Sequence, residues 1–340
     1  MEKFKVVPAW DMPEEEWLEF RKNGIGGSDA GTIIGVNKYN SAYALWAERV
    51  GLVEREFTGN DATDWGNELE LPTARMYAKK HNKAVVEWPV ILVSEENPFM
   101  FANLDFLLVE PSEEFRAGTV TTWRFNYAPP NVLGILEVKT TGIASPGTPH
   151  LWRNGGIPLG YQLQTIHYGI VTGWHDNITF AALVAGEGLQ VRHLEWDEEI
   201  AENLVIAEQQ FWDLVISKTP PPVDGSEATE SAQQSMYGRH EPGKGYEGGS
   251  ALMELWQEFE AAKREADEAD ARRKALRARV IELVGNSEYA TVNGDVILTY
   301  RTSKDSEVLD TDRFKREAPE IFELYKKTRP GARVLRGTNN

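Results

Sequence analysis

Glu137 and Lys139 stand two residues apart in the segment Leu136–Lys139, which reads LEVK. Alternate side chains of a β-strand share a face, so a strand here points Glu137 and Lys139 the same way and Val138 into the core. A carboxylate that binds a metal, beside an amine that orients water and stabilises its hydroxide form, suits metal-assisted hydrolysis. Alone the pattern is weak, because E-x-K alternation arises by chance on many exposed strands.

One carboxylate does not hold Mg²⁺, which favours carboxylate oxygens together with water and substrate phosphate. Asp105 in NLDF lies on the preceding candidate strand, and Glu70 in WGNELE lies at the start of a candidate helix. We expect these acids and Glu137 to converge at one end of a sheet. Asp105 could instead end a hairpin, and Glu70 could form a capping box with Asn67. The order of the acids along the chain favours the metal site.

Gln164 and Tyr161 lie three residues apart in the predicted helix 158–173 and therefore share a face. Gln164 is a candidate to hydrogen-bond the attacking water or a phosphate oxygen, with Tyr161 packed beside it. An ordinary amphipathic helix with an aromatic core stripe explains the pair as well, and on these residues alone it is the better explanation.

Arg21 and Ser28 flank the turn NGIGGS, and Lys38 follows the next predicted helix, which Ser28 can cap. Backbone N–H groups at a helix start, a hydroxyl and a guanidinium make a plausible anion site. A simple link between two helices is about as good an explanation.

The amino-acid composition excludes several classes of protein and of functional site. A hydrophobic content of 41% is too high for a disordered chain, and the absence of cysteine excludes disulfides, thiolate zinc sites and iron–sulfur clusters. The net charge of -17 predicts that any DNA binding is salt-sensitive and confined to one local basic surface. We see neither a signal peptide nor a membrane-spanning run, and expect a cytoplasmic protein.

The hydrophobic pattern predicts an α/β fold. Helices are expected at 13–22, 41–50, 67–80, 158–173 and 197–218. VVEWPVILV, FMFANLDFLLVE and GILEVKTT predict neighbouring strands, with a long polar loop at 111–131 between the last two. A hairpin is expected around Gly186–Gly188. We expect a catalytic domain at 1–224, a linker at 225–250 and an extension at 251–340.

The extension is expected to contain a helix at 251–284, an Asn-Gly hairpin, a helix at about 310–327 and a basic tail. Its long helix has a narrow coiled-coil-like seam on a 4-3 spacing, interrupted once by Arg273. The seam could pack on itself, on the core or on a partner. Its apolar positions are Leu252, Leu255, Phe259, Ala262, Ala266, Ala269, Leu276, Val280 and Leu283.

Over residues 10–225 the sequence resembles the YqaJ viral recombinase and lambda exonuclease family of PD-(D/E)XK nucleases. The matching motifs, in family order, are RKNGIGGS, WGNELE, NLDF, LEVK, YQLQ with the following HY and TG, and FWDLVISKTPPPVDG. The resemblance implies a restriction-endonuclease-like core, with a central mixed sheet flanked by helices. It also implies digestion of linear duplex DNA from the 5′ end, which leaves a 3′ overhang and releases 5′-mononucleotides.

By the same resemblance, Glu70, Asp105, Glu137 and the Val138 carbonyl would bind Mg²⁺, for which Mn²⁺ is expected to substitute. Lys139 would activate water and Gln164 would position it. Arg21 and Ser28, with Lys38 and with Tyr161 nearby, would hold the 5′-phosphate and DNA. The candidate catalytic residues are therefore Glu70, Asp105, Glu137, Lys139 and Gln164.

The family works with a single-strand annealing recombinase of the RecT or Beta type, and its lambda-type members form trimeric rings. A homo-oligomer is therefore expected, although the added C-terminal helix leaves the trimeric form open. Two other functions remain open on the residues: a structure-specific or restriction-like endonuclease on the same core, and a non-catalytic protein that binds DNA ends.

Overall fold

The computed structural model describes residues 3–54, 61–141, 148–328, 333 and 335–337. The chain divides into two compact units, Met1–Gly238 and Arg239–Asn340. This boundary falls inside the segment 225–250, and the finer division into a domain, a linker and an extension stays a prediction. None of the helices in the described ranges is long and apolar enough to cross a membrane.

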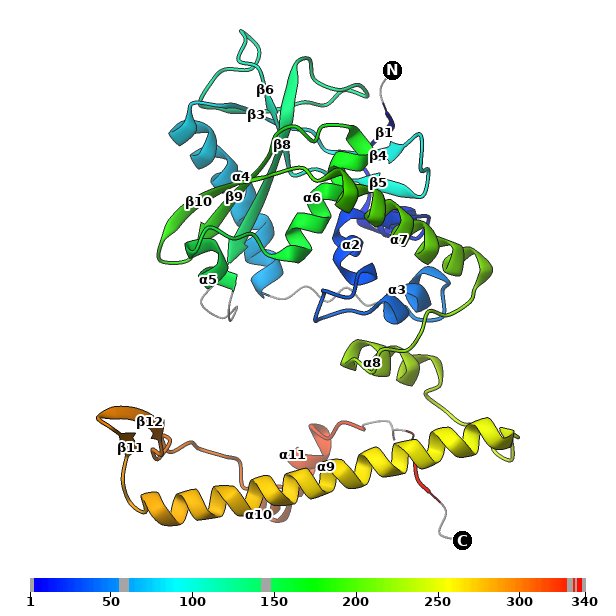
Figure 1. The fold of residues 1–340 in the computed structure, drawn as a ribbon, viewed down its shortest axis with the longest axis vertical. Helices are drawn as coiled ribbons and strands as arrows, with labels where there is room; N and C mark the ends of the chain where they lie inside the picture. The colour runs from blue at the N-terminus through cyan, green and yellow to red at the C-terminus, as the bar shows by residue number, and fades with distance from the viewer. Residues whose placement is uncertain (1–2, 55–60, 142–147, 329–332, 334, 338–340) are drawn as a thin grey trace. The chain divides into compact units, whose positions relative to one another are not determined.

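A mixed sheet forms the centre of the first unit (Figure 1). In the described residues its strands follow the order β10-β9-β8-β6-β3-β7. They are β3 Ala84–Glu87, β6 Phe106–Val109, β7 Val120–Thr122, β8 Val132–Thr141, β9 Ile178–Val184 and β10 Gly188–Leu194. β8 runs antiparallel to β6 and parallel to β9. The predicted pairing of the Asp105 and LEVK segments is therefore confirmed, as is the hairpin of β9 and β10.

A smaller sheet lies beside it, in the order β1-β4-β5-β2. Its described strands are β1 Phe4–Pro8, β2 Ile25–Gly26, β4 Val90–Ser94 and β5 Met100–Ala102. β2 pairs with β5 in parallel, directly before helix α2. This pairing fixes the turn that carries the candidate anion-binding residues.

The described helices of the first unit are α1 Glu14–Arg21, α2 Gly27–Ile33, α3 Ala42–Arg49, α4 Asp61–His81, α5 Thr148–Arg153, α6 Leu159–Thr172, α7 Glu198–Ser217 and α8 Glu227–Met236. Some of them cover the two faces of the main sheet. On one face Tyr77 of α4 packs with Val138. On the other, Tyr168 of α6 and Phe211 of α7 pack with Ile135. The predicted α/β class, with a mixed sheet between helices, is confirmed.

Helix α4 differs from the prediction, because it begins at Asp61 and not at Asn67, which places Pro72 in its interior. Proline removes one backbone donor there. The buried Tyr77 and its neighbours beyond the proline hold the helix on the sheet. Glu70 therefore lies within the helix, so a capping box with Asn67 is wrong.

The segment 111–131 is not simply a polar loop. It contains β7, which pairs in parallel with β3. Phe115 and Trp123 on either side of β7 are buried, and their rings meet edge to face with centroids 5.6 Å apart. These two aromatic side chains explain why the segment folds back onto the sheet.

The second unit contains helices α9 Gly249–Val284, α10 Thr311–Glu317 and α11 Pro319–Leu324, with strands β11 Tyr289–Val292 and β12 Asp295–Thr299. The predicted long helix and hairpin are confirmed, and Asn293 and Gly294 have the positive φ angles, 53° and 91°, of a tight hairpin turn. The single helix expected at 310–327 is wrong, because Pro319 disfavours helical geometry at the preceding residue. Residues 329–332 of the expected basic tail lie outside the described residues.

Candidate active site

Asp105 and Glu137 lie side by side on neighbouring strands. Phe106 is the register partner of Leu136, so Asp105, directly before β6, comes next to Glu137 on β8. The backbone N–H of Val138 donates a hydrogen bond of 2.8 Å to Oδ2 of Asp105. Besides burial, the charge of Asp105 raises the pKa of Glu137, as expected for two neighbouring carboxyl groups. The sheet register therefore brings together two acids that are far apart in the sequence.

Lys139 completes this group from the same strand as Glu137. Its Nζ donates to Oε1 of Glu137 at 2.5 Å, while Val138 is buried in the cluster on the α4 side. The alternation predicted for this strand is thus confirmed. Glu137 is 0% exposed, and its second oxygen, Oε2, has no hydrogen-bond partner among the described residues.

Glu70 approaches the group from α4. The pKa of Glu70 is raised to about 7, first by burial and then by the charge of Asp105, while Lys139 opposes the shift. Glu87 at the end of β3 also raises the pKa of Glu70. Glu87 accepts a 2.8 Å hydrogen bond from Thr122. Sequence reasoning missed Glu87, because its signal is only an acid ending an apolar strand.

Burial disfavours the ionised forms of the two strand acids, Asp105 and Glu137. Burial raises the pKa of Glu137 to about 8, with the Asp105 charge adding to the effect, and burial also raises the pKa of Asp105. Burial opposes the charged form of Lys139, but Glu137 and Asp105 outweigh it and raise the Lys139 pKa above its ordinary value. The lysine is therefore a fixed positive charge, while the acids gain from a further cation nearby.

The donor chemistry of the acids fits a hard divalent cation, which prefers carboxylate oxygens. The buried Oε2 of Glu137, with its unmet hydrogen-bonding capacity, points to the same class of ligand. As the side chains stand, no three His, Cys, Asp or Glu residues in the described part of the chain are arranged to hold a metal ion together. Binding one therefore requires side chains to move.

Helix α6 presents Gln164 and Tyr161 on the same side of the sheet as Glu137. The Nζ of Lys139 lies 5.1 Å from the centre of the Tyr161 ring. Gln164 donates a 2.8 Å hydrogen bond from Nε2 to the hydroxyl of Tyr168. Burial raises the pKa of Tyr168 well above its usual range, and the charges of Glu137 and Asp105 raise it further.

The sequence places Tyr168 on the helix face of Tyr161 and Gln164, but it is not among the predicted site residues. It is 5% exposed, and it lies within electrostatic range of the strand acids. Its spacing of four residues from Gln164 was the available signal, since residues i and i+4 share a helix face.

The structure brings Arg21 and Ser28 together. Nη2 of Arg21 donates to Oγ of Ser28 at 3.2 Å and to Oδ1 of Asp29 at 3.3 Å. Asp29 is also bound by Arg49, at 2.6 Å, and the charges of Arg49 and Arg21 outweigh burial to lower its pKa. Arg21 is thus positioned by a buried carboxylate beside the exposed hydroxyl of Ser28.

Ser28 does not cap α2, contrary to prediction. The helix begins at Gly27, with Gly26 as the N-cap, so Ser28 lies in the first turn. Oδ2 of Asp29 accepts the Gly26 N–H at 3.1 Å and takes the capping role instead. Asp29 is favoured because Arg21 and Arg49 keep it charged.

The acid cluster around Glu137 and the Arg21–Ser28 pair both act on Tyr168. A Cβ on Gly27 would lie 2.4 Å from the Tyr168 ring, so glycine permits the close contact of α2 with α6. The charge of Arg21 acts on Tyr168 and lowers its pKa against the larger effect of burial. Lys38 is exposed, with Nζ 4.8 Å from the centre of the Tyr39 ring. No described hydrogen bond or ion pair joins Lys38 to Arg21 or Ser28.

Comparisons with known proteins agree with this arrangement of motifs. Residues 16–175 match the family model described as the YqaJ-like viral recombinase domain. The uncharacterised protein YqaJ of Bacillus subtilis (strain 168) is 28% identical over 319 residues, which cover 93% of this chain and 92% of YqaJ.

Among solved structures, an alkaline exonuclease from Laribacter hongkongensis, LHK-Exo, matches with a TM-score of 0.46 and 14% identity, over 60% of this chain and 94% of that one. The structure of LHK-Exo with dAMP matches to the same extent. Residues 16–175 are therefore similar to the YqaJ-like viral recombinase domain, and the chain is similar to YqaJ over most of its length.

Proposed function

We propose that this protein is a metal-dependent nuclease that digests linear duplex DNA from an end. The observation that carries the proposal is the meeting of Asp105, Glu137 and Lys139 at neighbouring strands, with Glu70 in electrostatic range. These side chains come from three separate segments and leave a buried carboxylate oxygen that has no hydrogen-bond partner in the described part of the chain. A structural ion pair has no need of additional buried acids, which destabilise one another.

Glu70, Asp105, Glu137 and the Val138 carbonyl are the proposed ligands of Mg²⁺ or Mn²⁺. When bound, the cation would neutralise the acids and supply Lewis-acid stabilisation to the scissile phosphate and the attacking hydroxide. The sheet register sets Asp105 next to Glu137, and the Val138 N–H holds Asp105 in place.

Lys139 acts as a positive charge that orients the attacking water and stabilises its hydroxide form. Its raised pKa supports this role and argues against a neutral amine acting as general base. Gln164 is proposed to position the water, with its amide group oriented by the hydrogen bond to Tyr168. Tyr161 packs over Lys139 at the side of the site.

Arg21 and Ser28 are proposed to bind a terminal 5′-phosphate. A guanidinium and a hydroxyl at 3.2 Å present adjacent donors to one anion, and Asp29 fixes the guanidinium. Their connection to the acids through Tyr168 supports a single path for the DNA strand. Lys38 is assigned a weaker role, as an exposed charge for the DNA backbone.

We further propose 5′→3′ digestion that leaves a 3′ overhang for a single-strand annealing recombinase. The recombinase description of the matching family supports a place in recombination. The class of reaction that consumes this product is annealing, because an exposed 3′ strand is ready to pair with a complementary strand.

Timed digestion of duplexes labelled separately at each 5′ and 3′ end tests this function, run with Mg²⁺ beside covalently closed circles. We expect release of labelled 5′-mononucleotide first, retention of the 3′-labelled strand end, and intact circles. Equal cutting of circles and linear duplex would instead indicate an endonuclease. DNA binding without any Mg²⁺-dependent release would indicate a non-catalytic end-binding protein.

A further inference from the structure

Helix α9 exposes an apolar seam along its length. None of its residues, all of which the structure describes, is buried. Leu255, Phe259, Leu276 and Val280 of the seam are 63%, 44%, 48% and 42% exposed. A contiguous exposed apolar surface of this kind marks an interaction site, and a 4-3 spacing selects another helix as the partner.

We propose that α9 pairs with α9 of a second copy of this chain, in an antiparallel coiled coil centred between Asp267 and Glu268. The seam begins and ends with apolar residues and is symmetric in spacing about this centre. In an antiparallel pair the a positions of one helix face the d positions of the other. Leu255 then faces Val280 of the second copy.

The layers of the seam complement one another in this register. Phe259 faces Leu276 of the second copy, so large apolar residues meet in the outer layers. Arg273, the interruption in the seam, faces the small Ala262, which leaves room for its guanidinium to reach the solvent at the edge. The central layers contain alanine alone, which permits close approach of the helices.

The charges that flank the seam select the antiparallel orientation. Glu258 faces Arg279 of the second copy, and Glu265 faces Arg272. On the opposite flank Lys263 faces Asp270, although Asp270 also pairs within its own helix with Lys274 at 2.7 Å. Each flanking ion pair occurs twice because the arrangement is two-fold symmetric.

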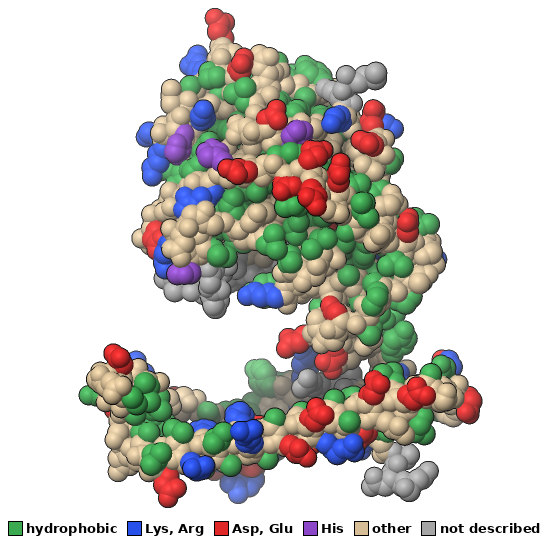
Figure 2. All heavy atoms as spheres, viewed as in Figure 1, with side chains coloured by type: hydrophobic (Ala, Val, Ile, Leu, Met, Phe, Trp, Pro, Cys, Tyr) green, Lys and Arg blue, Asp and Glu red, His purple; other side chains and the backbone are tan. Residues whose placement is uncertain are grey.

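A parallel pair would keep one attractive flanking contact, Glu258 with Lys263, and would set the other flanking charges against like charges. Arg273 would face its own copy, Glu265 would oppose Asp270, and Arg272 would oppose Arg277. Figure 2 shows the cause, since acidic side chains gather mostly over the first half of α9 and basic side chains over the second half. In an antiparallel pair, the acidic half of each helix lies against the basic half of the other.

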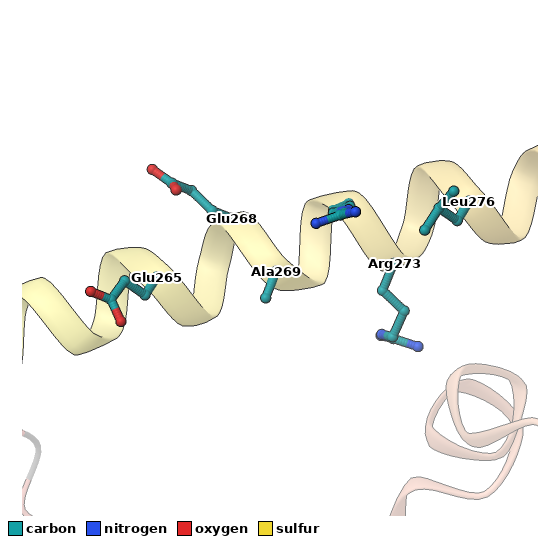
Figure 3. Close-up of a pocket in the computed structure, with 6 residues that line it drawn as sticks. Glu265, Glu268, Ala269, Arg273 and Leu276 are labelled. Atoms are coloured by element: carbon teal, nitrogen blue, oxygen red, sulfur yellow. The ribbon is translucent and has the colours of Figure 1, made fainter.

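A shallow, open surface pocket lies along the middle of α9, where the second helix would lie, and Figure 3 shows the side chains that line it. It is lined by Glu265, Glu268, Ala269, Arg272, Arg273 and Leu276. Ala269, Arg273 and Leu276 belong to the seam, and Glu265 and Arg272 are two of the flanking charges that the pairing uses. At the C-terminal end of α11 in the same unit, Leu324 and the following Tyr325 remain 78% and 79% exposed, so these side chains are not used to cover the seam.

Disulfide trapping in the full chain tests whether the two helices are antiparallel. Because the chain has no native cysteine, only the introduced cysteines can form a disulfide. Leu255→Cys and Val280→Cys are made separately and co-expressed, then oxidised and run on a non-reducing gel. Positions 255 and 280 are about 38 Å apart along one helix, so self-pairs are out of reach in the antiparallel arrangement. We expect dimers from co-expression and none from either variant alone. Dimers from Leu255→Cys alone would overturn the proposal.

The molar mass in solution tests the pairing itself. We expect an even number of 38.3 kDa chains by light scattering at micromolar concentration. Glu265→Arg should weaken the pairing about 10-fold, because it sets two like-charge pairs in place of attractive ones. Glu265→Arg combined with Arg272→Glu should restore it. Glu254→Arg on the outer face is the matched control and should have no effect.

Two results from the mass measurement would overturn the proposal. One is a monomer throughout the concentration range, which would mean that the seam has no second copy as its partner. The other is tighter association of Glu265→Arg, because in a parallel pair this arginine would face Asp270.

Discussion

The carboxylate of Asp105 accepts a hydrogen bond from the backbone N–H of Val138, at 2.8 Å. Val138 is the residue between Glu137 and Lys139, so one backbone contact fixes the acid of β6 against both functional side chains of β8. The backbone register of β6 and β8 produces this placement, and it does not depend on a contact between side chains. The proposed metal site therefore depends on the pairing of two strands as much as on its ligands.

The variant Asp105→Asn is expected to reduce nuclease activity without reducing the stability of the fold. The amide oxygen can still accept the Val138 N–H, while the variant removes a buried charge that raises the pKa of Glu137. We expect nuclease activity to fall by about 10²–10⁴-fold, with Tm at pH 8 unchanged or higher when no metal is present. Activity assays and differential scanning fluorimetry measure both. A variant with wild-type activity would remove Asp105 from the site.

The pH dependence follows from the pKa of Glu137, which burial raises from 4.5 to about 8. The stability that Glu137 contributes is present below its unfolded pKa and is lost as pH rises through the folded pKa. Without metal, we expect Tm to fall between about pH 5 and 8, and to fall less in Glu137→Gln. The exposed Glu68→Gln is the control and should follow the wild type.

Added Mg²⁺ should raise Tm more at pH 8.5 than at pH 6, because cation binding requires ionised acids. Activity should rise through the same range, as Glu70, with a pKa of about 7, and Glu137 lose their protons. A pH-independent thermal shift would contradict the assignment of these acids as ligands. Fluorimetry over pH 6 to 9 provides the measurement.

Lys139→Ala removes the positive charge that opposes the raised pKa values of Glu137 and Glu70. We expect activity to fall by about 10²-fold or more, with the rising limb of the pH–rate profile displaced to higher pH. Lys139→Arg keeps the charge and should leave that limb in place. An unshifted profile in Lys139→Ala would show that the lysine does not act on these acids.

Arg21→Ala tests end recognition. Loss of one charge-assisted contact to phosphate should reduce the preference for 5′-phosphorylated over 5′-hydroxyl ends by about 10–100-fold. Lys22→Ala, at the adjacent exposed position, is the control and should keep the preference. If Arg21→Ala behaves as the wild type on both kinds of end, an endonuclease on the same core becomes the better account.

His167 and Glu208 form a buried pair that holds α6 in place. Nδ1 of His167 lies 2.9 Å from Glu208, and Nε2 lies 3.0 Å from the Phe101 carbonyl. Breaking a buried pair leaves one partner uncompensated, so His167→Ala should cost about 3–5 kcal/mol of unfolding free energy. Urea denaturation measures this cost, with the exposed Glu202→Gln on α7 as the control. A loss no larger than that of the control would show that the pair does not stabilise the fold.

Much of the fold and site could be predicted from the sequence because local patterns were strong. The alternation of Glu137, Val138 and Lys139 fixed which side chains share a face, and the Asn293–Gly294 turn fixed a hairpin. The predictions that were wrong concern features that depend on tertiary contacts. Packing beyond Pro72 extends α4 to Asp61, and two arginines make Asp29 a better cap than Ser28.

Tyr168 and Glu87 show the remaining limit. Each acts on the acids through space, from α6 and β3, and neither belongs to a motif of regular spacing with the acids. Their placement depends on how α6 lies over β8 and on the pairing of β3 with β6. Such distances between elements are set by packing, which a single sequence does not display.

The central claim is that Glu70, Asp105 and Glu137 hold a divalent cation at which DNA is cut. The most direct measurement is Mn²⁺ or Mg²⁺ binding by calorimetry at pH 8.5, paired with metal-dependent nucleotide release, for the wild type, Glu137→Gln and the control Glu68→Gln. We expect the wild type and Glu68→Gln to bind the metal and release nucleotides, and Glu137→Gln to lose both. Full metal binding and nucleotide release by Glu137→Gln would contradict the account.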